Sequence, residues 1–174
     1  MIVRLLGRSV ALAALWCTGA LGAAAAPAAT QDETTCRGTI GTRSIDGDVR
    51  VPRGATCRLN ATRVDGNVRI YRGATLLATR VRVGGNVQAE NAKRISVARS
   101  FVDGSVQLKQ GRNGSISLTR NTVGSDIQLF SNRGPSVVSR NVVDGNLQCK
   151  SNRPGPTGGS NRVDGNKEDQ CARL

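Results

Sequence analysis

The five residues Val64-Asp-Gly-Asn-Val68 form a unit that recurs, with small changes, seven times along this chain of 174 residues. Each unit but the last has one apolar residue on either side of a short polar turn, and successive units begin 19 to 21 residues apart. Repetition at this period is typical of a solenoid, in which each coil buries its apolar face by stacking on its neighbours. The seven units are Ile45–Val49, Val64–Val68, Val83–Val87, Val102–Val106, Val123–Ile127, Val143–Leu147 and Val163–Lys167.

Apolar residues between the units alternate with polar ones, which is the pattern of a strand that buries one face. Further apolar pairs, such as Leu76 and Ala78, precede the next unit. Three short strands joined by Gly-containing corners close a coil of triangular section. We therefore predict an all-β, single-domain parallel β-helix, or β-solenoid, of about seven coils of 19–21 residues across 36–174. Its clearest inward column, two residues after each unit, is Val51, Ile70, Ala89, Leu108, Leu129 and Cys149.

The fourth position of the unit carries an amide, carboxylate or hydroxyl side chain in every coil. Stacked side chains of this kind hydrogen-bond from coil to coil and satisfy the backbone of the turn. We interpret this column as a structural ladder, because the Asp column beside it is interrupted at Gly84 and Gly124 and so is a poor metal site. No metal and no cofactor are expected. The ladder comprises Asp48, Asn67, Asn86, Ser105, Asp126, Asn146 and Asn166, and a second column holds Asn121, Asn141 and Asn161.

The last unit ends in Lys167, and Asp169 follows at a position that is apolar in the earlier coils. A polar terminal coil blocks the open sheet edge that would otherwise invite another chain. We therefore expect a monomer. Small residues such as Ala78 and Ala89 in the inward columns indicate a narrow interior without a ligand cavity, so that any binding takes place on the outer surface.

The first 26 residues have the three zones of a Sec-type signal peptide, with Arg4 and Arg8 before an apolar stretch and then a run of small residues. The apolar stretch, residues 10–21, is shorter than the roughly 20 residues that a membrane-spanning helix needs. We therefore expect no membrane span and a secreted or periplasmic protein. A flexible segment at 27–35 is predicted to precede the solenoid domain at 36–174.

Four cysteines remain after removal of this leader, which contains Cys17. An even number in an exported chain predicts disulfides and allows three pairings. Pairs between the two ends would span several coils, far beyond the roughly 7 Å between Cα atoms that a disulfide tolerates. We therefore predict Cys36–Cys57 at one end and Cys149–Cys171 at the other, each about two residues out of stacking register. The chain has no Cys-x-x-Cys motif and no His, so the cysteines do not indicate catalysis.

The chain is strongly basic, with 25 Lys and Arg against 12 Asp and Glu. Without the two arginines of the leader the balance is 23 (25 − 2) against 12, a net charge of +11. These cations follow the repeat in two rows. The first row lies three residues before a unit and consists of Arg80, Arg99, Arg120 and Arg140. The second row lies ten residues after a unit begins and consists of Lys93, Arg112, Arg133 and Arg153. Arg53 and Arg72 are close to this second row, which lines the loops 110–114, 131–135 and 151–159.

The two basic rows have two interpretations. A row of cations along one edge suits a polyanion, such as an anionic polysaccharide, another cell-envelope polymer, a lipid head group or a nucleic acid. Alternatively, the Arg stems cover apolar edges and keep a solvated rod soluble. Sequence-specific nucleic-acid binding is not expected, because Tyr71, Phe101 and Phe130 are too few for a series of stacking platforms.

The C-terminal segments Asn141-Val-Val-Asp-Gly-Asn-Leu-Gln-Cys-Lys150 and Gly165-Asn-Lys-Glu-Asp-Gln-Cys171 resemble a group of uncharacterised secreted bacterial β-helix proteins. The resemblance extends from Cys36-Arg-Gly-Thr-Ile40 to the end, and it implies the fold and export without an activity. The repeat is also similar to that of bactofilins, which are cytoplasmic polymers with apolar ends. The leader, the terminal cysteines and the polar last coil depart from that second pattern.

We therefore expect a non-catalytic exported β-solenoid that acts as an envelope-associated structural or binding module. One alternative is a polysaccharide-active enzyme, such as a lyase with Arg99 near Asp103, although the paired carboxylates of a glycosidase are not apparent. Another is a self-associating or adhesive surface protein.

Overall fold

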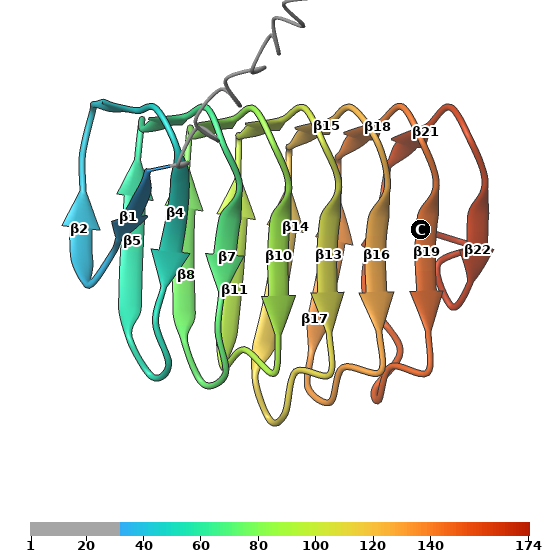
Figure 1. The fold of residues 1–174 in the computed structure, drawn as a ribbon. Helices are drawn as coiled ribbons and strands as arrows, with labels where there is room; N and C mark the ends of the chain where they lie inside the picture. The colour runs from blue at the N-terminus through green and yellow to red at the C-terminus, as the bar shows by residue number, and fades with distance from the viewer. Residues whose placement is uncertain (1–31) are drawn as a thin grey trace, which may run out of the picture. The chain divides into compact units, whose positions relative to one another are not determined.

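The computed structural model describes residues 32–174, which form a β-solenoid of seven three-stranded coils followed by one last strand (Figure 1). The predicted leader and the predicted flexible segment as far as residue 31 lie outside the described residues. All strand pairs are parallel, and no helix occurs between residues 32 and 174. The predicted all-β solenoid is therefore confirmed.

The strands stack into three sheets, here named A, B and C in the order in which each coil contributes to them. Sheet A contains β1 (Glu33–Thr35), β4 (Asp48–Val51), β7 (Val68–Ile70), β10 (Val87–Glu90), β13 (Val106–Lys109), β16 (Ile127–Phe130), β19 (Leu147–Lys150) and β22 (Lys167–Asp169). Sheet B contains β2 (Gly38–Ile40), β5 (Thr56–Asn60), β8 (Thr75–Thr79), β11 (Arg94–Ala98), β14 (Ser115–Thr119), β17 (Ser136–Ser139) and β20 (Thr157–Gly159). Sheet C contains the two-residue strands β3 (Ser44–Ile45), β6 (Arg63–Val64), β9 (Arg82–Val83), β12 (Phe101–Val102), β15 (Thr122–Val123), β18 (Val142–Val143) and β21 (Arg162–Val163).

The register between coils follows the repeat. Val87 pairs with Val106 and Ala89 with Leu108, so equivalent residues of successive units lie side by side. A slip by one residue would turn every buried side chain of a strand to the outside. The six residues of the predicted inward column are all buried, from Val51 to Cys149. The core consists of small and branched aliphatic residues together with the four cysteines, and none of the aromatic residues between 32 and 174 is buried in it.

Amide ladders support the corners of the coil. In the predicted ladder, the side-chain oxygen of each residue from Asp48 to Asn146 accepts a hydrogen bond from the backbone N–H of its counterpart in the next coil, and Asn166 ends the ladder as a donor. The second column is buried, and the Oδ1 of Asn141 accepts hydrogen bonds from both the backbone and the side chain of Asn121 at 3.0 Å. Buried polar groups with complete hydrogen bonding hold a backbone in one geometry. The corners are therefore well supported positions on which to place side chains.

The two ends of the solenoid carry the predicted disulfides. Cys36 and Cys57 have a Cα–Cα distance of 5.5 Å, and Cys149 and Cys171 one of 5.3 Å. Gly38 is the register partner of Cys57, and Asp169 is that of Cys149, so each disulfide joins residues two positions out of register, as predicted.

Two end features modify the predictions. Glu33–Thr35 form strand β1, which pairs with β4, so the flexible segment predicted at 27–35 is wrong for its last three residues. The backbone of Asp48 also bonds back to Asp32, which extends this pairing. At the other end, a turn through Cys171 brings Leu174 against the core.

We expect the double variant Cys149→Ala, Cys171→Ala to lower the free energy of unfolding by about 3 kcal/mol. This disulfide closes a loop with a sequence separation of 22, and cross-linking a loop of this size restricts the unfolded chain by about that amount. Urea unfolding under oxidising conditions measures the change. Reductant should lower the wild-type midpoint further than this variant does, because it opens both bonds; an unchanged midpoint in the variant would contradict the prediction.

Candidate basic-corner site

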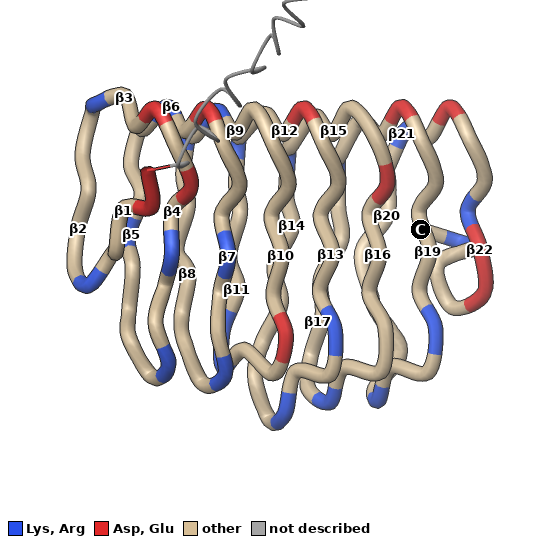
Figure 2. The backbone as a smooth tube through the Cα atoms, viewed as in Figure 1, with Lys and Arg blue, Asp and Glu red and all other residues tan. Residues whose placement is uncertain are grey.

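Three corners separate the sheets within each coil, and their charges differ. The A–B corner follows a sheet A strand, the B–C corner follows a sheet B strand, and the C–A corner contains the polar turn of the repeat unit. In Figure 2 the lower edge, which is the A–B corner, carries Lys and Arg, whereas Asp residues recur along the upper edge. The solenoid therefore separates its charges by corner rather than by coil.

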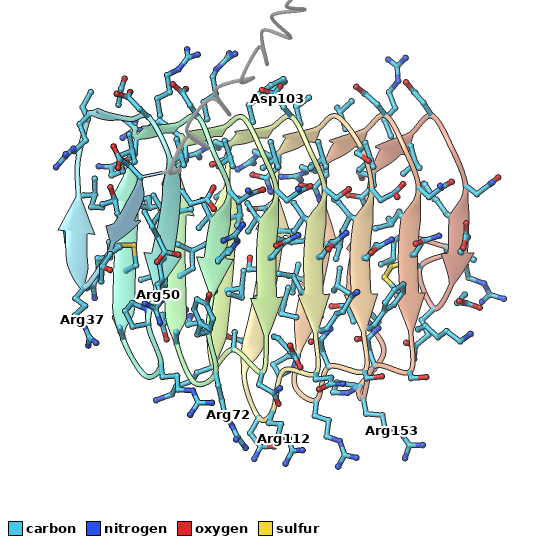
Figure 3. The ribbon with its side chains drawn as sticks, in the orientation of Figure 1. Arg37, Arg50, Arg72, Asp103, Arg112 and Arg153 are labelled. Carbon is cyan, nitrogen blue, oxygen red and sulfur yellow. A yellow bond between two sulfur atoms is a disulfide. The ribbon has the colours of Figure 1, made fainter. Side chains whose placement is uncertain are left out.

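The A–B corner has one cation and no acidic residue in each of the seven coils. All seven side chains are exposed, and none of them forms a salt bridge with a carboxylate in the described part of the chain. Figure 3 shows Arg37, Arg72, Arg112 and Arg153 along this edge. We call this set the basic corner: Arg37, Arg53, Arg72, Lys93, Arg112, Arg133 and Arg153.

The basic corner has regular stacking where its loops are longest. The backbone of Arg133 forms parallel β-bridges with that of Arg112 in the preceding coil and that of Arg153 in the following coil. Beneath them runs a third amide ladder in which Asn132 bonds to Asn152 at 3.0 Å, and Asn152 bonds to Gln170 at 2.8 Å through its backbone. Both asparagines are buried, so this ladder fixes the backbone from which the side chains of Arg133 and Arg153 extend.

The sequence analysis missed this ladder and underestimated the row. Asn132 and Asn152 recur immediately before Arg133 and Arg153, and that 20-residue step was a usable signal. Arg37 precedes the first repeat unit, which begins at Ile45, so counting ten residues from the start of a unit could not find it. The third loop, predicted at 151–159, is shorter than expected, because β20 begins at Thr157.

Two shallow hollows lie along the basic corner. The larger, of about 500 Å³, includes Arg53, Arg72 and Tyr71 and extends onto sheet A. The other, of about 470 Å³, is lined by Arg112, Arg133 and three neutral polar residues. A third hollow, of about 10 Å³, lies beside Ala89, Ala92 and Lys93. The two larger hollows are thus both lined by unpaired cations of the basic corner.

The other predicted row lies at the B–C corner. Arg80, Arg99, Arg120 and Arg140 are exposed and have φ angles of 51° to 57°, with Ala61 and Ser160 at the equivalent positions nearer the ends. This left-handed conformation is unusual for a residue with a Cβ atom. Sheet B separates this row from the basic corner, so the structure does not bring the two predicted rows into one site.

The outer face of sheet A carries a polar column that the sequence analysis also missed. Arg69, Gln88 and Gln107 are register partners in consecutive coils, and Gln128, Gln148 and Glu168 continue the column. Gln148 accepts a hydrogen bond from Gln128 at 2.9 Å and donates one to Glu168 at 3.1 Å. The signal was a polar residue five positions after the start of every unit. Sheet A therefore presents neutral amides between a basic and an acidic corner.

The two residues of the lyase alternative lie at different corners. Arg99 is at the B–C corner and Asp103 at the C–A corner, on either side of β12, and Figure 3 shows Asp103 at the upper edge. No group of three or more His, Cys, Asp or Glu side chains among residues 32–174 is placed to hold a metal ion. No helix in this described range is long and apolar enough to cross a membrane.

No protein-family model matches the chain, and neither a curated protein nor a solved structure matches it. The resemblance to secreted bacterial β-helix proteins and to bactofilins therefore stays a prediction. The two disulfides are compatible with an extracellular protein, because such bonds persist in oxidising compartments.

Proposed function

We propose that this protein is a non-catalytic, exported β-solenoid that binds an acidic polysaccharide of the cell envelope along the basic corner. The observation that carries this proposal is the unbroken row: each of the seven coils contributes one exposed cation to this corner, and no carboxylate interrupts it. A linear row of like charges is complementary to a linear polymer with regularly spaced anionic groups.

Electrostatics favours an external partner for this row. Coils stack about 4.8 Å apart. Two unit charges at that distance repel by a little under 1 kcal/mol even in water, and salt screens part of this. The four salt bridges in residues 32–174 use other arginines, so no ion pair within this range offsets the repulsion. Binding an anionic polymer would relieve it.

The neutral residues of the corner favour a polysaccharide over other polyanions. Gln110, Asn113 and Ser131 line the smaller hollow beside Arg112 and Arg133. Amide and hydroxyl groups both donate and accept hydrogen bonds, which suits the hydroxyl groups of a sugar. A polyphosphate offers only acceptors, and a nucleic acid would be expected to meet more aromatic platforms than this surface has.

Binding without turnover agrees with the carboxylates present. Glycoside hydrolysis needs two carboxyl groups that face one another across the substrate. Glu90 is the single carboxylate among the residues that line the larger hollow, and the smaller hollow has none. The basic corner thus offers groups that hold a polymer in place, and we assign it no catalytic step.

We expect the variant with Lys93, Arg112, Arg133 and Arg153 all changed to Gln to bind an acidic polysaccharide at least 100-fold more weakly than the wild type. A cation near an anionic surface contributes about 1 kcal/mol, and each 1.4 kcal/mol is a factor of ten. Binding should also lose much of its salt dependence, since fewer counterions are released. A salt series with acidic and neutral polysaccharides measures both effects.

The B–C row provides a comparison of equal charge. Changing Arg80, Arg99, Arg120 and Arg140 to Gln removes the same four charges from the other edge of sheet B. A clearly smaller loss of affinity is expected for that variant. An equal loss would show that only bulk charge matters, and a larger loss would move the site to the B–C corner; either result would overturn the proposal.

A further inference from the structure

The larger hollow differs in kind from the rest of the basic corner. It extends across four coils from Arg53 onto sheet A, and it combines cations with an aromatic ring, neutral amides and one carboxylate. A surface that held a polyanion by charge alone would need only the cations. Its volume of about 500 Å³ lies within the range of small-molecule sites.

Tyr71 is the exposed aromatic residue of this hollow, with 38% of its surface accessible. The guanidinium of Arg50, in the preceding coil, lies 5.0 Å from the centre of the ring. Arg50 is not among the residues that line the hollow, so the ring meets the hollow with the surface that Arg50 leaves uncovered. This contact holds the ring in position before any ligand arrives.

The polar groups around Tyr71 are also held in place. Asp48, whose side chain is only 5% exposed, forms a salt bridge with Arg69 at 3.0 Å. Gln88 pairs in register with Arg69 on one side and with Gln107 on the other, so the three form one straight column. Glu90 follows two residues after Gln88 and pairs with Lys109, which places a carboxylate and a cation in the next column.

We infer that this hollow is a sugar-specific subsite that takes one uronate unit of the bound polymer. The C–H face of the pyranose ring stacks on Tyr71, the carboxylate of the uronate meets Arg69 and Arg72, and its hydroxyl groups hydrogen-bond to Glu90 and Gln88. A carboxylate such as Glu90 only accepts hydrogen bonds, and a sugar hydroxyl can donate one to it whereas a phosphate polymer cannot. This inference rests on the proposed function, because the basic corner supplies the remaining contacts to the chain.

The test measures how tightly two kinds of polyanion bind to the wild type and to the Tyr71→Ala variant, both as the disulfide-bonded protein without the predicted leader. Polygalacturonate and alginate serve as uronate polymers, and inorganic polyphosphate serves as a polyanion without sugar. Tyr71→Ala should weaken binding of the uronate polymers about tenfold, which is the size of an aromatic stacking contribution, and should leave polyphosphate binding within about twofold. Tyr71→Phe, which keeps the ring, should bind like the wild type.

Phe101→Ala is the matched control. Phe101 is an aromatic residue on sheet C, half-buried, with the guanidinium of Arg82 at 4.8 Å from its ring, and it does not line the hollow. This variant should change uronate binding by less than about twofold. Because Tyr71 is the only tyrosine of the chain, ring labelling also gives a single NMR signal for this site, and oligogalacturonate should shift it whereas polyphosphate should not.

The outcomes separate this inference from the proposed function. If the variant with four Gln substitutions in the basic corner loses binding but Tyr71→Ala binds both kinds of polymer normally, the inference of a subsite is wrong. The proposed binding of polyanions by the basic corner then still stands. If Tyr71→Ala weakens uronate and polyphosphate binding equally, the hollow has no preference for sugar. If wild type binds neither uronate polymer, the inference fails, whereas the proposed function fails only if the other acidic polysaccharides of the salt series are not bound either.

Discussion

We expect the Asn141→Leu substitution to lower the free energy of unfolding by about 4 kcal/mol. Asn141 is 1% exposed, and its Oδ1 accepts two hydrogen bonds from Asn121, while its Nδ2 donates to Leu118 and Asn161. Leu has a similar size but neither donates nor accepts. The Asn121 N–H and the Leu118 carbonyl would then stay buried without a partner, and each such group costs about 1–3 kcal/mol.

Asn166→Ala is the control for this ladder variant. Asn166 ends the ladder at the C–A corner, its side chain is exposed, and only its backbone N–H takes part in a ladder hydrogen bond. Its replacement should change stability by less than about 0.5 kcal/mol. Urea unfolding of both variants, followed by circular dichroism, measures the difference. If Asn141→Leu unfolds at the wild-type midpoint, the buried amide column does not hold the coils together.

The Gly134→Ala variant is expected to lose about 4 kcal/mol of stability or to displace the corner beside Arg133. Gly134 has a φ of +133°, in a region that residues with a Cβ atom rarely adopt. A Cβ atom built on Gly134 would overlap the backbone carbonyl oxygen of Gly114 in the preceding coil. Neither atom can move freely, because the N–H of Gly134 donates to the carbonyl of Arg153 at 2.8 Å.

Gly155→Ala is the control in the next coil of the same corner. An added Cβ atom there would find Gln170 Nε2 at 3.6 Å, an ordinary contact, so the change should be within about 0.5 kcal/mol. Thermal unfolding and polysaccharide binding should be measured together on both variants. We expect Gly134→Ala to weaken both, since Arg133 depends on this backbone; stability equal to that of Gly155→Ala would contradict the steric argument.

These two predictions concern the same question, which is how a solenoid positions side chains on its corners. A corner must turn the chain sharply within a few residues, and stacked neighbours allow it little room. At the A–B corner the positive-φ positions include Gln110, Ser131, Ser151 and Gly134, so Arg112, Arg133 and Arg153 do not have to adopt them. At the B–C corner, by contrast, Arg80, Arg99, Arg120 and Arg140 occupy the left-handed positions themselves.

Much of the fold could be predicted from residues that repeat with a constant step. Val64-Asp-Gly-Asn-Val68 and its six counterparts predicted the coils, and alternation around Ala89 and Leu108 predicted which side chains point inward. The disulfide pairing followed because a cysteine reaches only a residue in an adjacent coil. Each of these predictions involves only residues that are close in the sequence or that lie in adjacent coils.

Other features of the structure depend on residues that are far apart in the sequence, and these could not be predicted in the same way. The sequence analysis assigned two basic rows but could not tell that sheet B lies between them, because the corner at which a row falls depends on the lengths of all three strands. Arg37 belongs to the basic corner because it lies between β1 and β2, and β1 itself, at residues 33–35, forms by pairing with the edge of β4. The hollow at Tyr71 combines residues from four coils, which no single repeat contains.

The number of coils, their parallel stacking, the inward columns and the disulfides could all be predicted from the repeat, because a strict period leaves one way to bury the apolar face of every coil. Only the three-dimensional structure showed that sheet B separates the two cation rows, that Asn132 and Asn152 form a third buried ladder, and where the outer surface is hollow. These depend on how three strands and three corners of unequal length close into a triangle. Closure is a property of the whole coil, and no local pattern encodes it.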